Sequence, residues 1–241
     1  MNRTWSLPLL ALVVLVGCSR PVETPAQLES EQNQPVEPDF ATQVATVKAG
    51  QSDRIQIEAQ PISDEELQSL AGLENLEVLI LDYPTNAITR EGFATLGQLP
   101  KLMHLRLRGV KVDDESAEHL AKATGLQVLN LPQSDVTDAG MEKLASLQNL
   151  VQLRIGSSQL TDAGLESLKQ LPKLKRVHLI AVPLTDKGLA VFHDLPKLES
   201  LYIDGAKLSD AAYERLFAAK PELHVHVDQA HHDRDPHAHP H

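Results

Sequence analysis

The sequence predicts an α/β fold in which short helices and short parallel strands alternate in stacked units, that is, a solenoid. Three observations predict it: a motif that recurs at a fixed period, apolar residues at helical spacing in the first half of each unit, and apolar residues at every second position in the other half. One such unit cannot bury its own apolar face, so the units must stack and share a core. We expect this core to span residues 51–228.

The repeat is marked by Ser, Thr or Asp at positions that lie 26 residues apart once and 24 residues apart thereafter. Several of these positions open related strings, for example Thr137-Asp138-Ala139-Gly140. So long a match at a fixed period is not chance. The marked positions are Ser63, Thr89, Asp113, Thr137, Thr161, Thr185 and Ser209.

Each unit begins with residues that start a helix. Ser, Thr and Asp are preferred helix N-caps because their side chains accept a backbone N–H of the first turn, and a following Asp or Glu suits the positive helix end. Ser63 and Glu66 have the spacing of a capping box. Leu165 and Leu168 then follow at helical spacing, and Pro172 ends that helix.

Each unit closes with a half-buried strand, because apolar and polar residues alternate there. Ile55 lies 24 residues before Leu79 and predicts an additional first strand. We count eight parallel strands, from residues 55–57 to residues 225–227, with seven helical connections.

The apolar skeleton follows the pattern L-x-x-L-x-L-x-x-N/C-x-L over about residues 51–228. It resembles the leucine-rich repeat, in particular the 24-residue, ribonuclease-inhibitor-like repeats with Thr-Asp-x-Gly-Leu found in bacterial leucine-rich-repeat lipoproteins. The resemblance implies a curved right-handed horseshoe, with the strands on its concave face, short helices on its convex face, and a role in protein or peptide binding. In one respect the sequence departs from the pattern, because Val110, Ser134, Ser158, Val182 and Ala206 occupy the usual Asn or Cys position. The turn after each strand must therefore satisfy its backbone in another way.

Alternation also assigns the side chains of the concave face, the sheet face that points away from the helices. Basic side chains gather there although the chain is acidic overall. We expect this face to bind an acidic protein or peptide through the fork geometry of arginine. The alternative is a solvated sheet face that needs polar residues for solubility. The predicted partner-binding residues are His104, Arg106, Arg108, Asn130, Gln152, Arg154, Arg176, His178, Tyr202 and Asp204.

The loop at residues 82–88 holds two residues more than the other units. Insertions in solenoids map to one edge and often touch a ligand, which makes Tyr83 a candidate contact at the rim. The alternative is a loop insertion that is tolerated because loop length costs little.

The N-terminal residues resemble the signal peptide of a bacterial lipoprotein. An apolar stretch from Leu7 to Val16 is too short to span a bilayer as a helix. It ends in Leu15-Val16-Gly17-Cys18, which matches the lipobox and implies removal of residues 1–17 and acylation of Cys18, for example by palmitate. The alternative is an ordinary secretory signal that leaves a free thiol.

A proline-rich and acidic segment follows, and we expect residues 18–50 to form a disordered tether behind the lipidated cysteine. The predicted location is therefore the bacterial cell envelope, and Ser19 is compatible with sorting to the outer membrane.

Histidines are concentrated at the C-terminus, where we expect residues 229–241 to form a flexible tail. Imidazole is a common ligand of zinc, copper and nickel, so loose metal binding is one hypothesis and a low-complexity polar tail is the other. The candidate ligands are His224, His226, His231, His232, His237, His239 and His241.

Composition and motifs exclude several functions. A formal net charge of −11 and an aromatic content of 3% argue against binding to nucleic acid. The sequence holds no nucleophile elbow, zincin, P-loop or dinucleotide motif. We therefore expect a non-enzymatic protein that requires no cofactor. Three classes remain: a lipid-anchored recognition scaffold, a metal-binding lipoprotein, and a structural or adhesive solenoid.

Overall fold

The computed structural model describes residues 38–58, 60–83 and 88–235, which belong to one compact unit. The signal peptide of residues 1–17, the lipidation site Cys18 and the last three candidate histidines (His237, His239, His241) lie outside the described residues. Within the described residues, none of the helices has the length and apolar character needed to cross a membrane.

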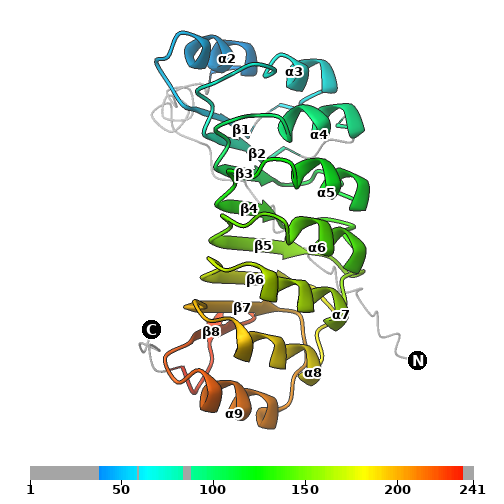
Figure 1. The fold of residues 1–241 in the computed structure, drawn as a ribbon, viewed down its shortest axis with the longest axis vertical. Coiled ribbons are helices and arrows are strands. Elements are labelled where there is room, and N and C mark those ends of the chain that lie inside the picture. Colours follow the sequence, from blue (N-terminus) through cyan, green and yellow to red (C-terminus); the bar gives the residue numbers. More distant parts are fainter. Residues whose placement is uncertain (1–37, 59, 84–87, 236–241) are drawn as a thin grey trace, which may run out of the picture. The chain divides into compact units, whose positions relative to one another are not determined.

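The strands form one sheet whose spatial order follows the chain order (Figure 1). The first eight strands pair in parallel and in register at the repeat period, which confirms the prediction of eight parallel strands. A ninth strand, which the sequence did not predict, pairs antiparallel with the eighth. The strands are β1 (Arg54–Ile57), β2 (Val78–Leu81), β3 (His104–Leu107), β4 (Val128–Leu131), β5 (Gln152–Gly156), β6 (Arg176–Ile180), β7 (Ser200–Asp204), β8 (His224–Val227) and β9 (Ala230–His231).

A helical segment fills each of the seven connections between the parallel strands, as expected, and the helices lie together on one side of the sheet (Figure 1). They are α3 (Asp64–Gln68), α4 (Arg90–Leu96), α5 (Asp114–Leu120), α6 (Asp138–Leu144), α7 (Asp162–Leu165) with η1 (Glu166–Gln170), α8 (Asp186–Leu189) with η2 (Ala190–Asp194), and α9 (Asp210–Ala219).

The core lies between the helices and the sheet and runs through the whole stack. In the strands, the residues equivalent to Leu79 and Leu81 are buried, as the alternation predicts, except Val227 on β8, which is half-buried. Two residues of the opposite face, Ile80 and Asn130, are also almost fully buried, with exposed fractions of 6% and 8%. The concave face is therefore more closely packed around these two positions than the alternation alone predicts.

All seven marked positions are helix N-caps, as predicted, and all except Thr89 accept a backbone N–H of the first turn with their side chain. The aspartate that follows them has a second role that the sequence did not reveal, because it binds the next repeat. The carboxylate of Asp138, for example, accepts the backbone N–H of Thr161 at 2.7 Å and its hydroxyl at 2.7 Å. We call the series of such contacts the aspartate ladder. Its pairs are Asp64 with Thr89, Asp114 with Thr137, Asp138 with Thr161, Asp162 with Thr185, and Asp186 with Ser209.

The ladder explains the glycine of the Thr-Asp-x-Gly motif. A Cβ atom on Gly164 would lie 2.4 Å from Asp138 Oδ1, and the other ladder glycines are equally close to an aspartate. The ladder is interrupted once, where Arg90 follows the cap residue Thr89. The next repeat carries Ser116 in place of glycine. The absence of the aspartate leaves room there for a side chain. The last pair of the ladder, Asp186 with Ser209, accommodates Ala212 at the glycine position, so glycine accompanies four of the five pairs.

The turns after the strands satisfy their backbone through the neighbouring repeat in place of an asparagine ladder. The N–H of Gly109 donates to Gln133 Oε1 at 2.7 Å, and that of Gly205 donates to Asp228 Oδ1 at 2.7 Å. Ser134 donates both its N–H (2.7 Å) and its hydroxyl (3.0 Å) to the carbonyl oxygen of Gly156. These three turns thus depend on the repeat that follows them.

The expectation of a disordered tether over residues 18–50 is wrong for its last part, because α2 (Phe40–Lys48) is a packed helix. Phe40, Val44 and Val47 are buried against the first repeat. The spacing of these three residues is that of one helical face, and the surrounding prolines and acidic residues obscured it. The folded domain therefore begins before residue 51.

The helix α2 also protects the free edge of the sheet. The side chain of Gln43 donates to the carbonyl oxygen of Gln56 on β1 at 2.7 Å and accepts its N–H at 2.8 Å. These bonds satisfy backbone groups that an edge strand otherwise exposes, and an exposed edge favours pairing with other chains.

The expectation of a flexible tail from residue 229 is also wrong for residues 229–235. Val227 pairs with Ala230 across a two-residue turn in which Asp228 and Gln229 both have positive φ (48° and 67°), the geometry of a type I′ hairpin. The last described residue is Asp235, and its side chain is fully buried. This hairpin covers the other edge of the sheet.

Candidate functional site

The concave face carries a straight row of side chains, because the parallel strands pair in register. Arg106, Asn130, Arg154, His178 and Tyr202 occupy equivalent positions on five successive strands, and each lies beside the next. The row continues to His226 on β8. We call these six residues the central row. Ten residues were predicted for this face, and the row brings five of them together.

Two of the basic side chains on this face have acidic partners. Arg106 forms an ion pair with Asp82 at 2.8 Å, and His178 Nε2 lies 2.8 Å from Asp204 Oδ2. The structure thus brings an acidic residue onto each of these two basic side chains. The concave face is therefore less basic than the sequence predicts.

Arg154 lies in the middle of the row and differs from these two. Burial, together with the neighbouring Arg106 and Arg108, lowers its pKa from the usual value for arginine. Its buried Nε atom has no hydrogen-bond acceptor among the described residues. The guanidinium is thus held close to like charges, an arrangement that an added anion would stabilise.

The remaining charged residues define the edges of the basic area. Arg108 and Arg176 are exposed, and within the described part of the chain no carboxylate lies close enough to either for an ion pair. Burial and the nearby Arg54 and Arg106 lower the pKa of His104, which favours its neutral form. The arginines of the concave face that form no ion pair among the described residues are therefore Arg54, Arg108, Arg154 and Arg176.

A cavity of about 400 Å³ opens on the concave face around Arg154. Polar side chains that can donate or accept hydrogen bonds surround it, with an aromatic ring at one side. The cavity has the size of a small ligand site and can accept a side chain of a partner. Its polar and aromatic lining residues are Asn130, Gln152, Arg154, Arg176, His178 and Tyr202.

Tyr83 follows β2 and is exposed, with an exposed fraction of 37%. The inserted residues that follow it, 84–87, lie outside the described residues. The position of Tyr83 is compatible with a contact at the rim, and this remains a prediction.

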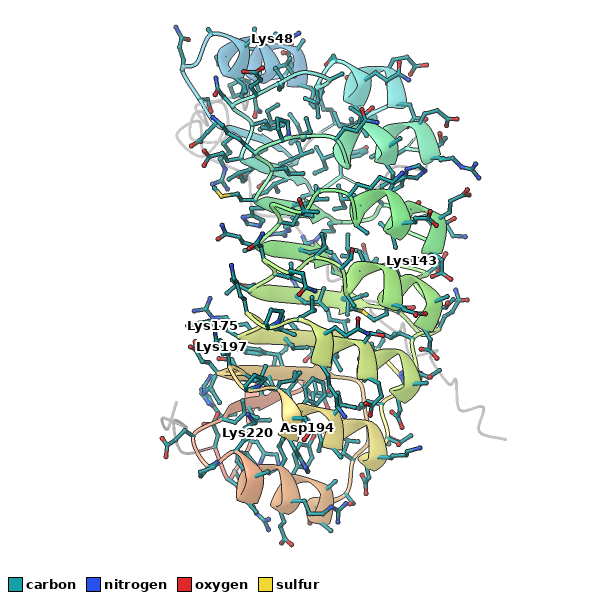
Figure 2. The ribbon with its side chains drawn as sticks, in the orientation of Figure 1. Lys48, Lys143, Lys175, Asp194, Lys197 and Lys220 are labelled. Atoms are coloured by element: carbon teal, nitrogen blue, oxygen red, sulfur yellow. The ribbon has the colours of Figure 1, made fainter. Side chains whose placement is uncertain are left out.

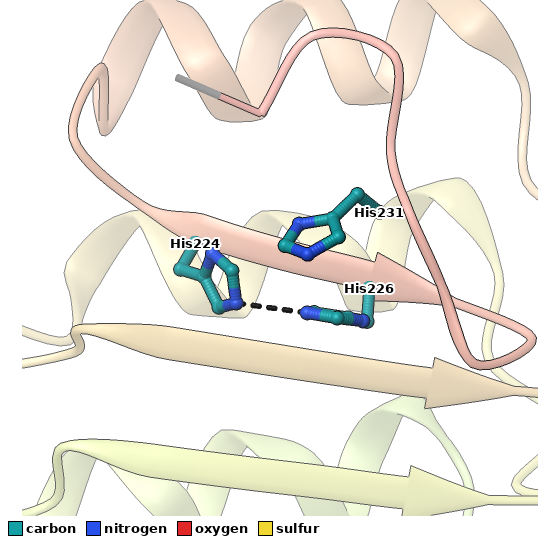
Figure 3. A group of neighbouring side chains, drawn as sticks. All are labelled: His224, His226 and His231. Atoms are coloured by element: carbon teal, nitrogen blue, oxygen red, sulfur yellow. Dashed lines mark hydrogen bonds between the residues drawn. The ribbon is translucent and has the colours of Figure 1, made fainter. Parts of the chain in front are cut away.

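The candidate metal ligands are divided between two places. His224, His226 and His231 come together at the end of the sheet (Figure 3). His232 instead contacts the rings of Tyr213 and Phe217, with ring centroids 4.2 and 5.3 Å away, and so helps to cover the core. His232 was predicted as a ligand because the sequence alone does not show which face of the hairpin each histidine occupies.

Sequence reasoning missed Asp235, which joins the histidine cluster from the end of the hairpin. Its Oδ2 accepts the N–H of Val225 at 2.9 Å and lies 2.9 Å from His224 Nδ1 and 3.3 Å from His231 Nδ1. The single signal in the sequence was an aspartate within a polar, histidine-rich segment, which does not distinguish a buried carboxylate from a solvated one.

Parallel strands at a 24-residue period, a helix in every connection and a continuous leucine core define a leucine-rich-repeat solenoid. In agreement, residues 146–169 match the family model described as Leucine Rich repeat. A comparison with curated proteins found no matching sequence.

Two solved structures of bacterial proteins have a similar fold. One is an internalin (InlF) from Listeria monocytogenes, with a TM-score of 0.51 and 18% identity over 76% of this chain and 65% of the internalin. The other is a leucine-rich-repeat protein of Leptospira interrogans, with a TM-score of 0.50 and 17% identity over 76% of this chain and 50% of that protein. The chain thus matches about two thirds of the first protein and half of the second.

Proposed function

We propose that this protein is a non-enzymatic, lipid-anchored scaffold of the bacterial cell envelope that binds an acidic protein or peptide on its concave face. The leucine-rich-repeat fold favours protein binding in general, because its open sheet offers an extended surface that is not covered by helices. The fold does not choose the ligand, so the choice of an acidic partner rests on the residues of the face.

The single observation that carries the proposal is the environment of Arg154. This side chain is half-buried beside two other arginines, lacks a partner for its buried Nε among the described residues, and lines a cavity. A carboxylate of a partner would neutralise the like charges and accept from the guanidinium fork. Arg176 lines the same cavity and offers a second fork.

The test compares two pairs of charge reversals in the full chain. Arg154→Glu with Arg176→Glu alters the cavity and leaves the ion pair between Arg106 and Asp82 intact. The control is Lys143→Glu with Lys187→Glu, which makes the same change in net charge on α6 and α8 (Figure 2 shows Lys143 on the helix side).

The immobilised proteins are exposed to an extract of the bacterial envelope, and the captured partner is then purified and titrated by calorimetry. We expect the cavity variant to bind at least about tenfold more weakly, as for the loss of a charge-assisted contact, and the control to bind as wild type. Equal binding by both variants, or no specific capture by wild type, would show that the face is merely solvated and would favour the structural or adhesive alternative.

The lipid anchor is tested separately, because it rests on residues 15–18 alone. Growth with labelled palmitate should label the wild-type chain and leave Cys18→Ser unlabelled. The substituted protein should also appear in the soluble fraction of lysed cells. Labelling of Cys18→Ser would contradict acylation at this residue.

A further inference from the structure

The three clustered histidines reach one another through the register of the C-terminal hairpin. His224 and His226 are two residues apart on β8 and therefore point to the same face. The two-residue turn places His231 directly opposite His226. One ring nitrogen of each of the three residues lies within 4.8 Å of the others (Figure 3).

The buried carboxylate of Asp235 lies beside two of these rings and forms a hydrogen bond with one of them, that of His231. It lies on the Nδ1 atoms of His224 and His231, at 2.9 and 3.3 Å. An imidazole that donates from Nδ1 to a carboxylate carries its lone pair on Nε2, which is the arrangement found behind metal-binding histidines. The N–H of Val225 fixes the carboxylate in turn, at 2.9 Å.

Ring nitrogens of the three histidines lie close together. His224 Nε2 and His226 Nε2 are 2.8 Å apart (Figure 3), and the rings of His226 and His231 have centroids 4.1 Å apart. Two histidines bound to one tetrahedral zinc ion at about 2.0–2.1 Å would have their nitrogens about 3.3 Å apart. A change of about 0.5 Å, which a small ring rotation supplies, therefore opens the site for an ion.

We propose that His224, His226 and His231 bind one divalent transition-metal ion of the zinc type, with Asp235 as the carboxylate that orients His224 and His231. Three imidazoles leave a fourth position of the tetrahedron open to water or to a side chain of another molecule. Because the cluster closes the end of the solenoid, the ion would hold the hairpin onto β8. None of its ligands lines the cavity around Arg154, although the ring of Tyr202 in that cavity stacks on His226 with centroids 4.5 Å apart.

The experiment titrates zinc chloride into the full chain by calorimetry after removal of metal with a chelator. Wild type should bind one ion per chain at this site. His226→Asn removes a proposed ligand and leaves Asp235 with the rings of His224 and His231 in place, and it should weaken binding at least about tenfold. Asp235→Asn should weaken it by about 10–100-fold, as for other residues that orient a metal ligand.

Three matched variants separate the site from other histidines and from the concave face. His237, His239 and His241 are replaced together by Asn, His193→Asn tests a histidine on the helix side, and Arg154→Glu tests the cavity. All three should bind zinc within about twofold of wild type, because none removes a proposed ligand. Circular dichroism confirms that each variant is folded before it is titrated.

A second readout of metal binding does not depend on calorimetry. Cobalt(II) in a site of low coordination number gives intense visible absorption, and zinc should displace it from wild type. The proposal is overturned if folded His226→Asn binds zinc as wild type does, or if the triple Asn variant loses the one-to-one binding. The first outcome would leave a hydrogen-bonded cluster of rings, and the second would place the metal on the last residues.

Discussion

The carboxylate of Asp138 on α6 accepts both the backbone N–H and the hydroxyl of Thr161, the cap residue of the next helix, at 2.7 Å each. Thr161 in turn uses its hydroxyl oxygen to accept the N–H of Ala163 at 3.2 Å. One carboxylate thus fixes the start of the following helix. The repeats are coupled through these contacts on the helix side as well as through the sheet and the leucine core.

Replacement of Asp138 by Ala should lower the free energy of unfolding by about 2 kcal/mol, because it removes two charge-assisted hydrogen bonds and leaves a cap N–H unsatisfied. Asp210 is the matched control: it holds the same motif position, but the described residues after α9 form β8 and the hairpin and not another capped helix. Asp210→Ala should change the stability by less than about 0.5 kcal/mol. Urea denaturation measures both, and equal losses would contradict a ladder role.

Gly164→Ala should destabilise the protein although alanine favours helices. Its Cβ would lie 2.4 Å from Asp138 Oδ1 and 2.8 Å from Asp138 Cα, so the backbone of the neighbouring helix must move, at a cost of about 1–3 kcal/mol. Ser116→Ala, at the equivalent position where Arg90 interrupts the ladder, avoids this clash. In a double-mutant cycle, Asp138→Ala should partly relieve the effect of Gly164→Ala. Strict additivity would mean that the two residues do not interact.

Phe40→Ala should destabilise the domain by about 3–5 kcal/mol, because Phe40 is 2% exposed and its removal leaves a cavity beneath α2. Tyr83→Ala, which truncates an exposed aromatic ring, serves as the control and should have little effect. Thermal unfolding followed by circular dichroism distinguishes them. An unchanged midpoint for Phe40→Ala would mean that α2 is not part of the cooperative unit.

The raised pKa of Tyr213 predicts that the free energy of unfolding falls at high pH. Burial, with contributions from Asp228 and Asp186, raises its pKa from 10.0 to about 12 in the folded chain. The unfolded chain therefore loses this proton at a lower pH than the folded chain, so the contribution to stability is full below pH 10 and falls as the pH rises from 10 toward 12.

Tyr213→Phe should remove that loss. Its hydroxyl has no hydrogen-bond partner among the described residues, so the substitution should cost little near neutral pH. Denaturation at about pH 8 and about pH 11 measures the difference between the two proteins. A difference that stays constant between these two pH values would contradict the shifted pKa.

Much of the fold could be predicted from the sequence because each repeat carries its own local signals. The cap residues, the leucine columns and the alternation in the strands depend on short-range spacing, and the structure confirms them from β1 to β8. The composition of the concave face could also be predicted, since it follows from the same alternation. What the spacing could not show is that Asp82 and Asp204 each pair with a basic residue of another strand.

The ends of the domain could not be predicted in the same way, because they do not repeat. The apolar face of α2 holds three residues within a segment whose prolines and charges favour disorder. The hairpin after β8 has Gln229 at the second position of its turn, where glycine is usual. Neither end offers a second copy with which a weak pattern can be compared.

The sequence by itself thus determined the period, the element types and the side chains that alternate onto each face, because these depend on residues close together in the chain. Only the tertiary structure decided which charged residues form ion pairs, why a glycine packs against most of the ladder aspartates, and which histidines cluster around Asp235. These contacts join residues about one repeat apart or across a turn, where a displacement of a few ångströms separates a bond from a solvated pair.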